Sequence, residues 1–170
     1  LGVGSLFGFI GNFMFAYVPY KLWLGLGLVP RDDLAPDLKS RRKITAFSVV
    51  AILGALACAL VIAWGLEILR LVPFAALGSI ISLNNALPAL VLGIPMMIVL
   101  YPRIKKWDLL WTDIMNPEDV PIPGGLSRIS AILMALFIIT GLFGGFVAAF
   151  KAGQGFLYEG FGTGGDVGSM

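Results

Sequence analysis

The feature that most constrains this chain is a run of 23 residues without a charged side chain, from Ile44 to Leu66. An α-helix rises about 1.5 Å per residue, so about 20 apolar residues cross the hydrocarbon core of a bilayer. Val72 to Tyr101 and Ile129 to Phe150 are equally free of charge, and Leu1 to Tyr20 is apolar and rich in glycine. These runs predict an integral membrane protein.

Composition supports this prediction. The chain is 58% hydrophobic and only 13% charged, whereas soluble domains have about 45–50% apolar and about 25% charged residues. We expect an all-α, polytopic bundle of about four spans, over residues of about 1–23, 44–66, 72–101 and 127–150. These form one transmembrane domain, 1–151, followed by a glycine-rich tail, 152–170. Because the first residue is not Met and already lies in an apolar pattern, we expect a missing upstream part.

The distribution of Lys and Arg predicts the orientation, because cytoplasmic loops of membrane proteins carry more of these residues. The loop 30–43 holds Arg31, Lys39, Arg41, Arg42 and Lys43, and the loop 102–128 holds Arg103, Lys105, Lys106 and Arg128. We therefore expect both loops to be cytoplasmic in a multi-pass protein of the plasma membrane. The cluster Lys39 to Lys43 is either a topology signal or a surface for anionic lipid or a cytoplasmic partner.

A short interfacial helix is predicted within the second basic loop, over about 104–115. Apolar residues recur there at helical spacing with charged residues between them, which is typical of an amphipathic helix lying on a membrane. This helix either caps the bundle or docks a partner. The candidate partner-binding residues are Trp107, Trp111, Arg41 and Arg42.

Polar residues inside the spans are few, and such residues in a membrane often mark function. Asn12 lies between glycines and aromatic residues, and Asn84 and Asn85 precede Pro88. Since proline removes a backbone donor, we expect the helix to kink or break near the paired amides. An amide suits either a small neutral polar ligand or a clasp between helices, and the sequence leaves both alternatives open.

Two further features concern the ends and faces of the spans. Glu67 and Arg70 follow Trp64 at the outer rim, as a surface ion pair or as the charged lip of an outward-facing site. Glycine favours close helix contact, and we expect flattened helix faces at Gly4, Gly8, Gly11, Gly141, Gly144 and Gly145.

Several classes of function are disfavoured. The sequence has no histidine, so it cannot ligate heme, chlorophyll or zinc through imidazole, and the single Cys58 cannot build a cluster site. It lacks a Walker-type loop, a GxSxG elbow and a pair of intramembrane acids. We therefore expect no catalytic residue, no metal, no cofactor and no enzymatic activity. A net charge of +2 does not indicate a nucleic-acid surface.

The segments GSLFGFIGNFMFAYVPYKLW and ACALVIAWGLEILRLVPFAALGSIISLNNALPALVLGIPMMIVLYPRIKKWDLLWTDIM, within residues 4–115, resemble archaeal membrane proteins related to the S components of energy-coupling factor transporters. The resemblance implies capture of a vitamin, a precursor or an ion from outside, and association with membrane subunits and cytoplasmic ATPases. It also implies a pocket surrounded by Asn12, Tyr17, Trp64, Glu67, Asn84 and Asn85.

A rival interpretation remains open at this point. The chain could be a non-catalytic structural or accessory subunit of a larger membrane complex. Its glycine faces and its Trp107/Trp111 helix would then be packing surfaces against lipid and other subunits, and its asparagines would be clasps.

Overall fold

The fold is all-α, as the sequence predicts. The computed structural model describes residues 2, 4–30, 33–115 and 128–149, apart from the side chains of Trp111 and Thr112, so the glycine-rich tail lies outside the described residues. Within this part of the chain the elements are α1 (Gly4–Gly25), α2 (Arg41–Ile68), α3 (Phe74–Val91), α4 (Gly93–Lys106), α5 (Trp111–Ile114) and α6 (Arg128–Ala149).

The chain is a membrane protein by the length and composition of its helices. Among the described residues, α2, α3 and α6 are long and apolar enough to cross a bilayer. The predicted first span, over about 1–23, corresponds to α1 but is not in this set. Asn12, Lys21 and the tyrosines of α1 lower its mean hydropathy, although the helix has 22 residues.

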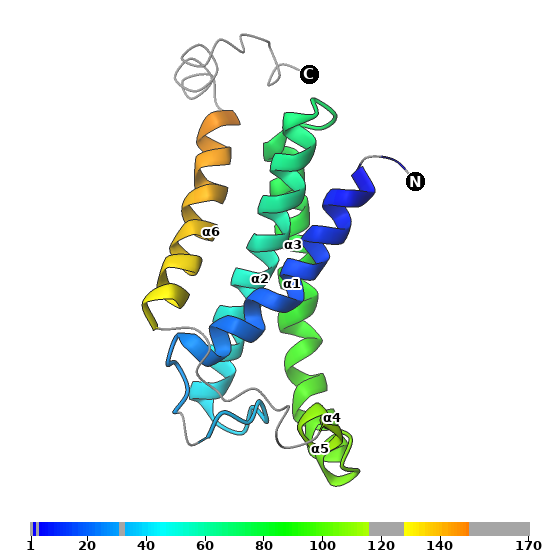
Figure 1. Ribbon diagram of the computed structural model, residues 1–170, viewed down its shortest axis with the longest axis vertical. Helices are drawn as coiled ribbons and strands as arrows, with labels where there is room; N and C mark the ends of the chain where they lie inside the picture. The colour runs from blue at the N-terminus through cyan, green and yellow to red at the C-terminus, as the bar shows by residue number, and fades with distance from the viewer. Residues whose placement is uncertain (1, 3, 31–32, 116–127, 150–170) are drawn as a thin grey trace.

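Helix α2 lies at the centre of the bundle, in contact with α1, α3 and α6 (Figure 1). Its most apolar stretch is 56% buried, compared with 11% for α3 and 28% for α6. Small residues on α2 account for this position, because Ala55, Ala59 and Ala63 have no exposed surface and let neighbouring helices come close. The outer helices keep most of their apolar surface free of contacts within the chain.

Glycines make the closest helix contacts. A Cβ added to Gly54 of α2 would lie 2.5 Å from Cγ of Pro19 in α1, and one added to Gly11 of α1 would lie 2.6 Å from Cγ1 of Ile62. At Gly145 of α6 an added Cβ would meet the Phe74 ring of α3. Real Cβ atoms do not approach other atoms this closely, so these positions require glycine for the observed packing.

The glycine prediction is right for some positions and wrong for others. Gly11, Gly141 and Gly145 lie at close contacts, whereas no atom lies within 4 Å of an added Cβ at Gly8 or Gly144. A Cβ added to Gly4 would make only an ordinary contact, 3.5 Å from Cδ2 of Leu66. The GxxxG pair of Gly4 and Gly8 is therefore not a packing seam, because an added Cβ collides with α2 at Gly11 and at neither member of the pair.

The predicted third span, 72–101, is divided into two helices. The chain stays helical through Asn84 and Asn85, and α3 ends at Val91, with Leu92 between α3 and α4. The amide of Leu92 donates to the Pro88 carbonyl at 2.9 Å, and Met96 donates to Leu92 at 3.0 Å. The break expected at the paired amides therefore lies one turn beyond Pro88.

The interfacial helix expected over 104–115 is not continuous. Helix α4 ends at Lys106, and Asp108 has a φ of +52°. The amide of Leu109 donates to the Ile104 carbonyl at 3.2 Å, which closes a turn typical of a helix C-terminus. Only the single turn α5 follows, so left-handed backbone at Asp108 separates the two halves of the predicted pattern.

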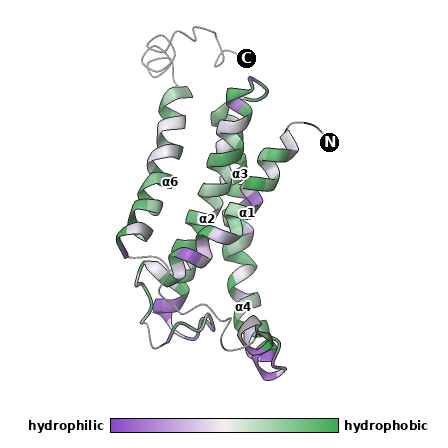
Figure 2. Ribbon diagram, viewed as in Figure 1, coloured by the Kyte–Doolittle hydropathy of each residue, from purple (hydrophilic) through white to green (hydrophobic). Residues whose placement is uncertain are grey.

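The basic segments gather at one end of the bundle (Figures 1 and 2). The C-terminal ends of α1 and α4 lie there with the N-terminal ends of α2 and α6, and hydrophilic residues concentrate at this end. The turn between α2 and α3 lies at the opposite end. The described parts of the loops 30–43 and 102–128 thus lie on the same side of the bundle. We call this end the basic end.

The glycine contacts give a paired test of packing. Gly145→Ala should lower the melting temperature in detergent, because the added methyl group collides with Phe74, which is 2% exposed and packed against Trp64 and Phe146. Overpacking of this kind costs about 1–3 kcal/mol. Gly144→Ala, with open space around its Cβ, is the matched control and should keep the melting temperature. Thermal circular dichroism measures both, and equal melting of the two variants would contradict the packing described.

Candidate functional site

A large apolar pocket lies toward the basic end, between α1, α2 and the α3–α4 helices. Its volume is about 810 Å³. Its walls come from the last turns of α1, the 34–36 segment, α2, the end of α3, α4 and the turn after α4. The lining residues are Tyr20, Trp23, Leu24, Leu34, Ala35, Pro36, Phe47, Ala89, Gly93, Met96, Met97, Leu100, Tyr101, Ile104 and Leu110.

The lining is chemically uniform. Aromatic rings come from α1, α2 and α4, and two adjacent thioethers come from Met96 and Met97, with no charged side chain among the lining residues. Such a surface binds apolar groups by burial of area, and aromatic rings favour flat ligands. Gly93 also lines the pocket, and a Cβ added there would lie 3.5 Å from the Phe47 ring, an ordinary contact.

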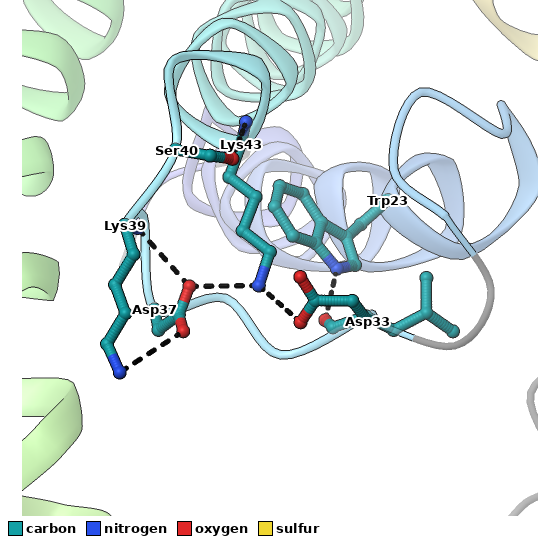
Figure 3. Close-up of polar contacts among 7 residues, drawn as sticks. Trp23, Asp33, Asp37, Lys39, Ser40 and Lys43 are labelled. Carbon is teal, nitrogen blue, oxygen red and sulfur yellow. Dashed lines mark hydrogen bonds and ion pairs between the residues drawn. The ribbon is translucent and has the colours of Figure 1, made fainter.

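One wall of the pocket is fixed by an ionic cluster (Figure 3). Nζ of Lys43 lies 2.6 Å from Oδ1 of Asp33 and 2.9 Å from Oδ1 of Asp37. The Lys43 side chain is only 4% exposed, compared with 15% for Asp37 and 59% for Asp33. A buried ammonium requires such partners, because its desolvation is costly. The backbone amide of Lys43 also donates to Oγ of Ser40, which caps α2.

The cluster determines the ionisation of Asp37. Hydrogen bonding from Lys43 holds the pKa of the Asp37 carboxyl below its usual value of 3.8, although burial acts in the opposite direction. The next residue, Leu38, is 2% exposed and has a φ of +51°. This left-handed conformation is unfavourable for a branched residue. Burial of the Leu38 side chain and the Asp37 ion pair together offset that cost.

Trp64 and Glu67, two of the predicted site residues, meet around Phe74. Nε1 of Trp64 donates to the Gly141 carbonyl of α6 at 3.2 Å, and its ring lies 5.1 Å from that of Phe74. Oε2 of Glu67 accepts from the Phe74 amide at 2.6 Å. A carboxylate at a helix N-terminus satisfies a free donor and the helix dipole. These contacts join α2 to α3 and α6 and do not border the apolar pocket.

Asn12 and Tyr17 lie on exposed parts of α1. Nδ2 of Asn12 donates to the Gly8 carbonyl of its own helix at 2.9 Å. The Tyr17 ring stacks on Phe13 at 5.4 Å and lies 5.5 Å from Nζ of Lys21. Neither side chain lines the pocket.

The paired amides of α3 diverge. Asn84 is exposed, whereas Asn85 is partly buried on α3, the helix that packs against α2. Both alternatives for the paired amides, a ligand contact and a helix clasp, stay predictions. The structure therefore brings Trp64 and Glu67 together, but it does not gather all six predicted side chains around one cavity of the described residues. Their role in ligand binding stays a prediction.

The predicted partner-binding residues have mixed surroundings. Arg41 is exposed, and Nε of Arg42 donates to the Leu28 carbonyl at 2.6 Å, so Arg42 also holds the end of α1. Trp107 is 63% exposed at the C-terminus of α4. The side chain of Trp111 lies outside the described residues. Lys43 itself is buried in its ion pairs, and the surface proposed for the basic cluster therefore excludes it.

The pocket was missed in the sequence, although a signal was present. Tyr20, Trp23 and Tyr101 read as aromatic anchors at the membrane interface, a role that such residues commonly have. Their accumulation beside both basic loops, together with Met96, Met97 and Gly93, was the available indication that these spans meet around a cavity.

Comparison with known proteins gives one partial match. No family model and no solved structure matches the chain significantly. A stretch of 49 residues is 51% identical to a protein named Heme A synthase from Granulibacter bethesdensis. The match covers 26% of this chain and 13% of that protein. The chain thus matches only a small part of the length of this relative.

This match overturns two predictions. The relative is a synthase, so the expectation of a substrate-binding transporter subunit, and that of a protein without enzymatic activity, are contradicted. A membrane enzyme does not need the Walker-type loop, the GxSxG elbow or the pair of intramembrane acids that this sequence lacks. The resemblance to S components stays an untested prediction, and the ATPase partners depended on the transport function.

Acid should weaken the ionic cluster. The pKa of Asp37 in the folded protein lies below its usual value of 3.8. The ionised carboxylate therefore stabilises the fold at pH values above the pKa of the unfolded chain. This stabilisation is lost as the pH falls through the lower pKa of the folded protein. We expect the wild-type melting temperature to drop between about pH 6 and about pH 3. Asp37→Asn should melt lower near pH 6 and show a smaller drop, by thermal circular dichroism. An identical drop in this variant would refute the assignment.

Proposed function

We propose that this chain is a membrane-embedded enzyme, or part of one, that acts on a large apolar substrate of the heme type. The observation that carries the proposal is the apolar pocket of about 810 Å³ between α1, α2 and α4. The partial match to a protein named Heme A synthase supports the choice of substrate class. Because that match covers little of either chain, both the activity and the substrate belong to the proposal.

The size and lining of the pocket fit such a substrate. Small-molecule sites typically have about 300–1,000 Å³ and bury most of the ligand surface against apolar and aromatic side chains. The rings of Tyr20, Trp23, Phe47 and Tyr101 supply flat surfaces for a macrocycle. A small polar ligand would leave this lining without complementary contacts, so the pocket favours an apolar occupant.

We assign heme to this pocket as a substrate rather than as a resident cofactor held by histidine. The sequence contains no histidine, so the chain cannot hold heme iron through imidazole. The pocket does offer the thioethers of Met96 and Met97 and the phenols of Tyr20 and Tyr101. These groups can contact a macrocycle, and the apolar walls would provide most of the binding free energy.

The surroundings of the pocket support a location near the cytoplasmic surface of the plasma membrane. The basic end contains Arg41 to Lys43 at the start of α2, Arg103, Lys105 and Lys106 at the end of α4, and Arg128 at the start of α6. Lys and Arg favour the cytoplasmic side of a membrane. The exposed apolar faces of α3 and α6 would contact lipid or further membrane subunits. A substrate could then enter from the bilayer without crossing water.

Binding of hemin to the full chain in lipid nanodiscs tests the proposal. Hemin absorbance should saturate at one molecule per chain, and Gly93→Trp should weaken the affinity by about tenfold or more. The indole would enter the pocket, while the Cβ at this position fits beside Phe47. Spectrophotometric titration measures both.

Gly144→Trp is the matched control, since a Cβ at Gly144 meets open space and this glycine does not line the pocket. It should bind hemin like the wild type. Equal hemin uptake by all three proteins, without saturation, would show partition into lipid and would contradict the proposed function.

A further inference from the structure

The pocket wall at 34–36 is a short segment with a carboxylate on each side. Leu34, Ala35 and Pro36 line the pocket, and Asp33 and Asp37 flank them. We call residues 33–37 the strap. Both carboxylates pair with the same nitrogen, Nζ of Lys43, at 2.6 and 2.9 Å. One side chain of α2 therefore holds both ends of the strap (Figure 3).

A second contact fixes the strap from α1. Nε1 of Trp23 donates to the Leu34 carbonyl at 2.8 Å, and Trp23 itself lines the pocket. The strap thus lies between α1 and α2 and is held by polar contacts to both. Its apolar residues face the cavity while its charged residues turn toward Lys43.

The position of Lys43 explains why it can act in this way. The side chain is 4% exposed in the first turn of α2, next to the capping residue Ser40. Breaking one side of a buried ion pair leaves a charge without compensation. The ion pairs with Lys43 therefore favour one position of the strap.

We propose that Lys43 is the positioning residue of the pocket, and that it determines ligand affinity by holding the strap closed over the cavity. This inference rests on the proposed function for the identity of the ligand. The role of Lys43 in holding the strap does not depend on that function. Lys43 does not line the pocket. It acts through Asp33 and Asp37 on the wall that Leu34, Ala35 and Pro36 form.

Thiol labelling tests the strap without any ligand. Ala35→Cys places a thiol on the wall, and native Cys58 is buried. In the full chain in nanodiscs, adding Lys43→Met should raise the maleimide labelling rate at position 35 by about tenfold, because the strap loses both ion pairs. Lys39→Met is the matched control: its side chain is 77% exposed and its nitrogen lies 3.9 Å from Asp37. It should leave the rate unchanged.

Further variants keep the test decisive. Asp33→Asn releases one end of the strap and should raise the rate by a smaller factor; it replaces Lys43→Met if that protein fails to fold. Lys43→Arg retains the charge and should restore slow labelling. An unchanged rate at position 35 in both Lys43→Met and Asp33→Asn would overturn the inference.

Hemin titration separates this inference from the proposed function. In proteins that keep the native Ala35, Lys43→Met should weaken hemin affinity by about tenfold. The titration is run well below the melting temperature of this variant, and Lys39→Met should bind hemin like the wild type. Wild-type affinity in Lys43→Met, alongside loss in Gly93→Trp, would reject the role of Lys43 and keep the pocket. Faster labelling without saturable hemin binding would support the strap and reject the heme-type substrate.

Discussion

The close approach of neighbouring helices to α2 is the constraint on which the bundle depends. Within a bilayer, lipid tails are as apolar as leucine, so helices associate through packing and polar contacts rather than by escape from water. Alanines and glycines on α2 allow that packing: Pro19 of α1 reaches Gly54, and Phe7 reaches Gly65. Phe74 fills the matching recess at Gly145. Trp64 and Glu67 then add hydrogen bonds to helices already brought close.

The ionic cluster fixes the connection between α1 and α2, which helix packing does not hold. Beyond the last turns of α1, the chain returns to α2 beside a cavity, and residues 33–39 of this connection form no helix. Lys43 holds this segment in place, since both carboxylates of the strap form ion pairs with its ammonium group. Leu38, with its left-handed backbone, follows immediately and buries its side chain. The same interactions therefore close the loop and shape one wall of the pocket.

The sequence predicts the positions of α2 and α6 well, and the contacts between helices poorly. The thickness of the bilayer sets the length of an uncharged stretch that crosses it. For this reason α2 and α6 lie close to the expected ranges 44–66 and 127–150. Which glycine faces a neighbour depends on helix rotation, so Gly8 and Gly11 looked equivalent although only Gly11 is in close contact. Lys43 likewise looked like one more basic loop residue. Its burial depends on the folding of Asp33 and Asp37 back onto α2, which no local pattern encodes.

The location of the pocket follows from what a membrane requires of polar and apolar residues. An amide or indole in an apolar helix needs a partner: Asn12 donates to the backbone of its own helix, and Trp64 of α2 donates to the Gly141 carbonyl of α6. These polar groups are thereby engaged within the bundle. An apolar ligand needs space instead, and the pocket lies where α3 is followed by α4 at Leu92, opposite the end of α1, with Ala89 and Gly93 in its lining. In this chain the apolar lining around the helix break, rather than the rare polar groups, marks the space open to a ligand.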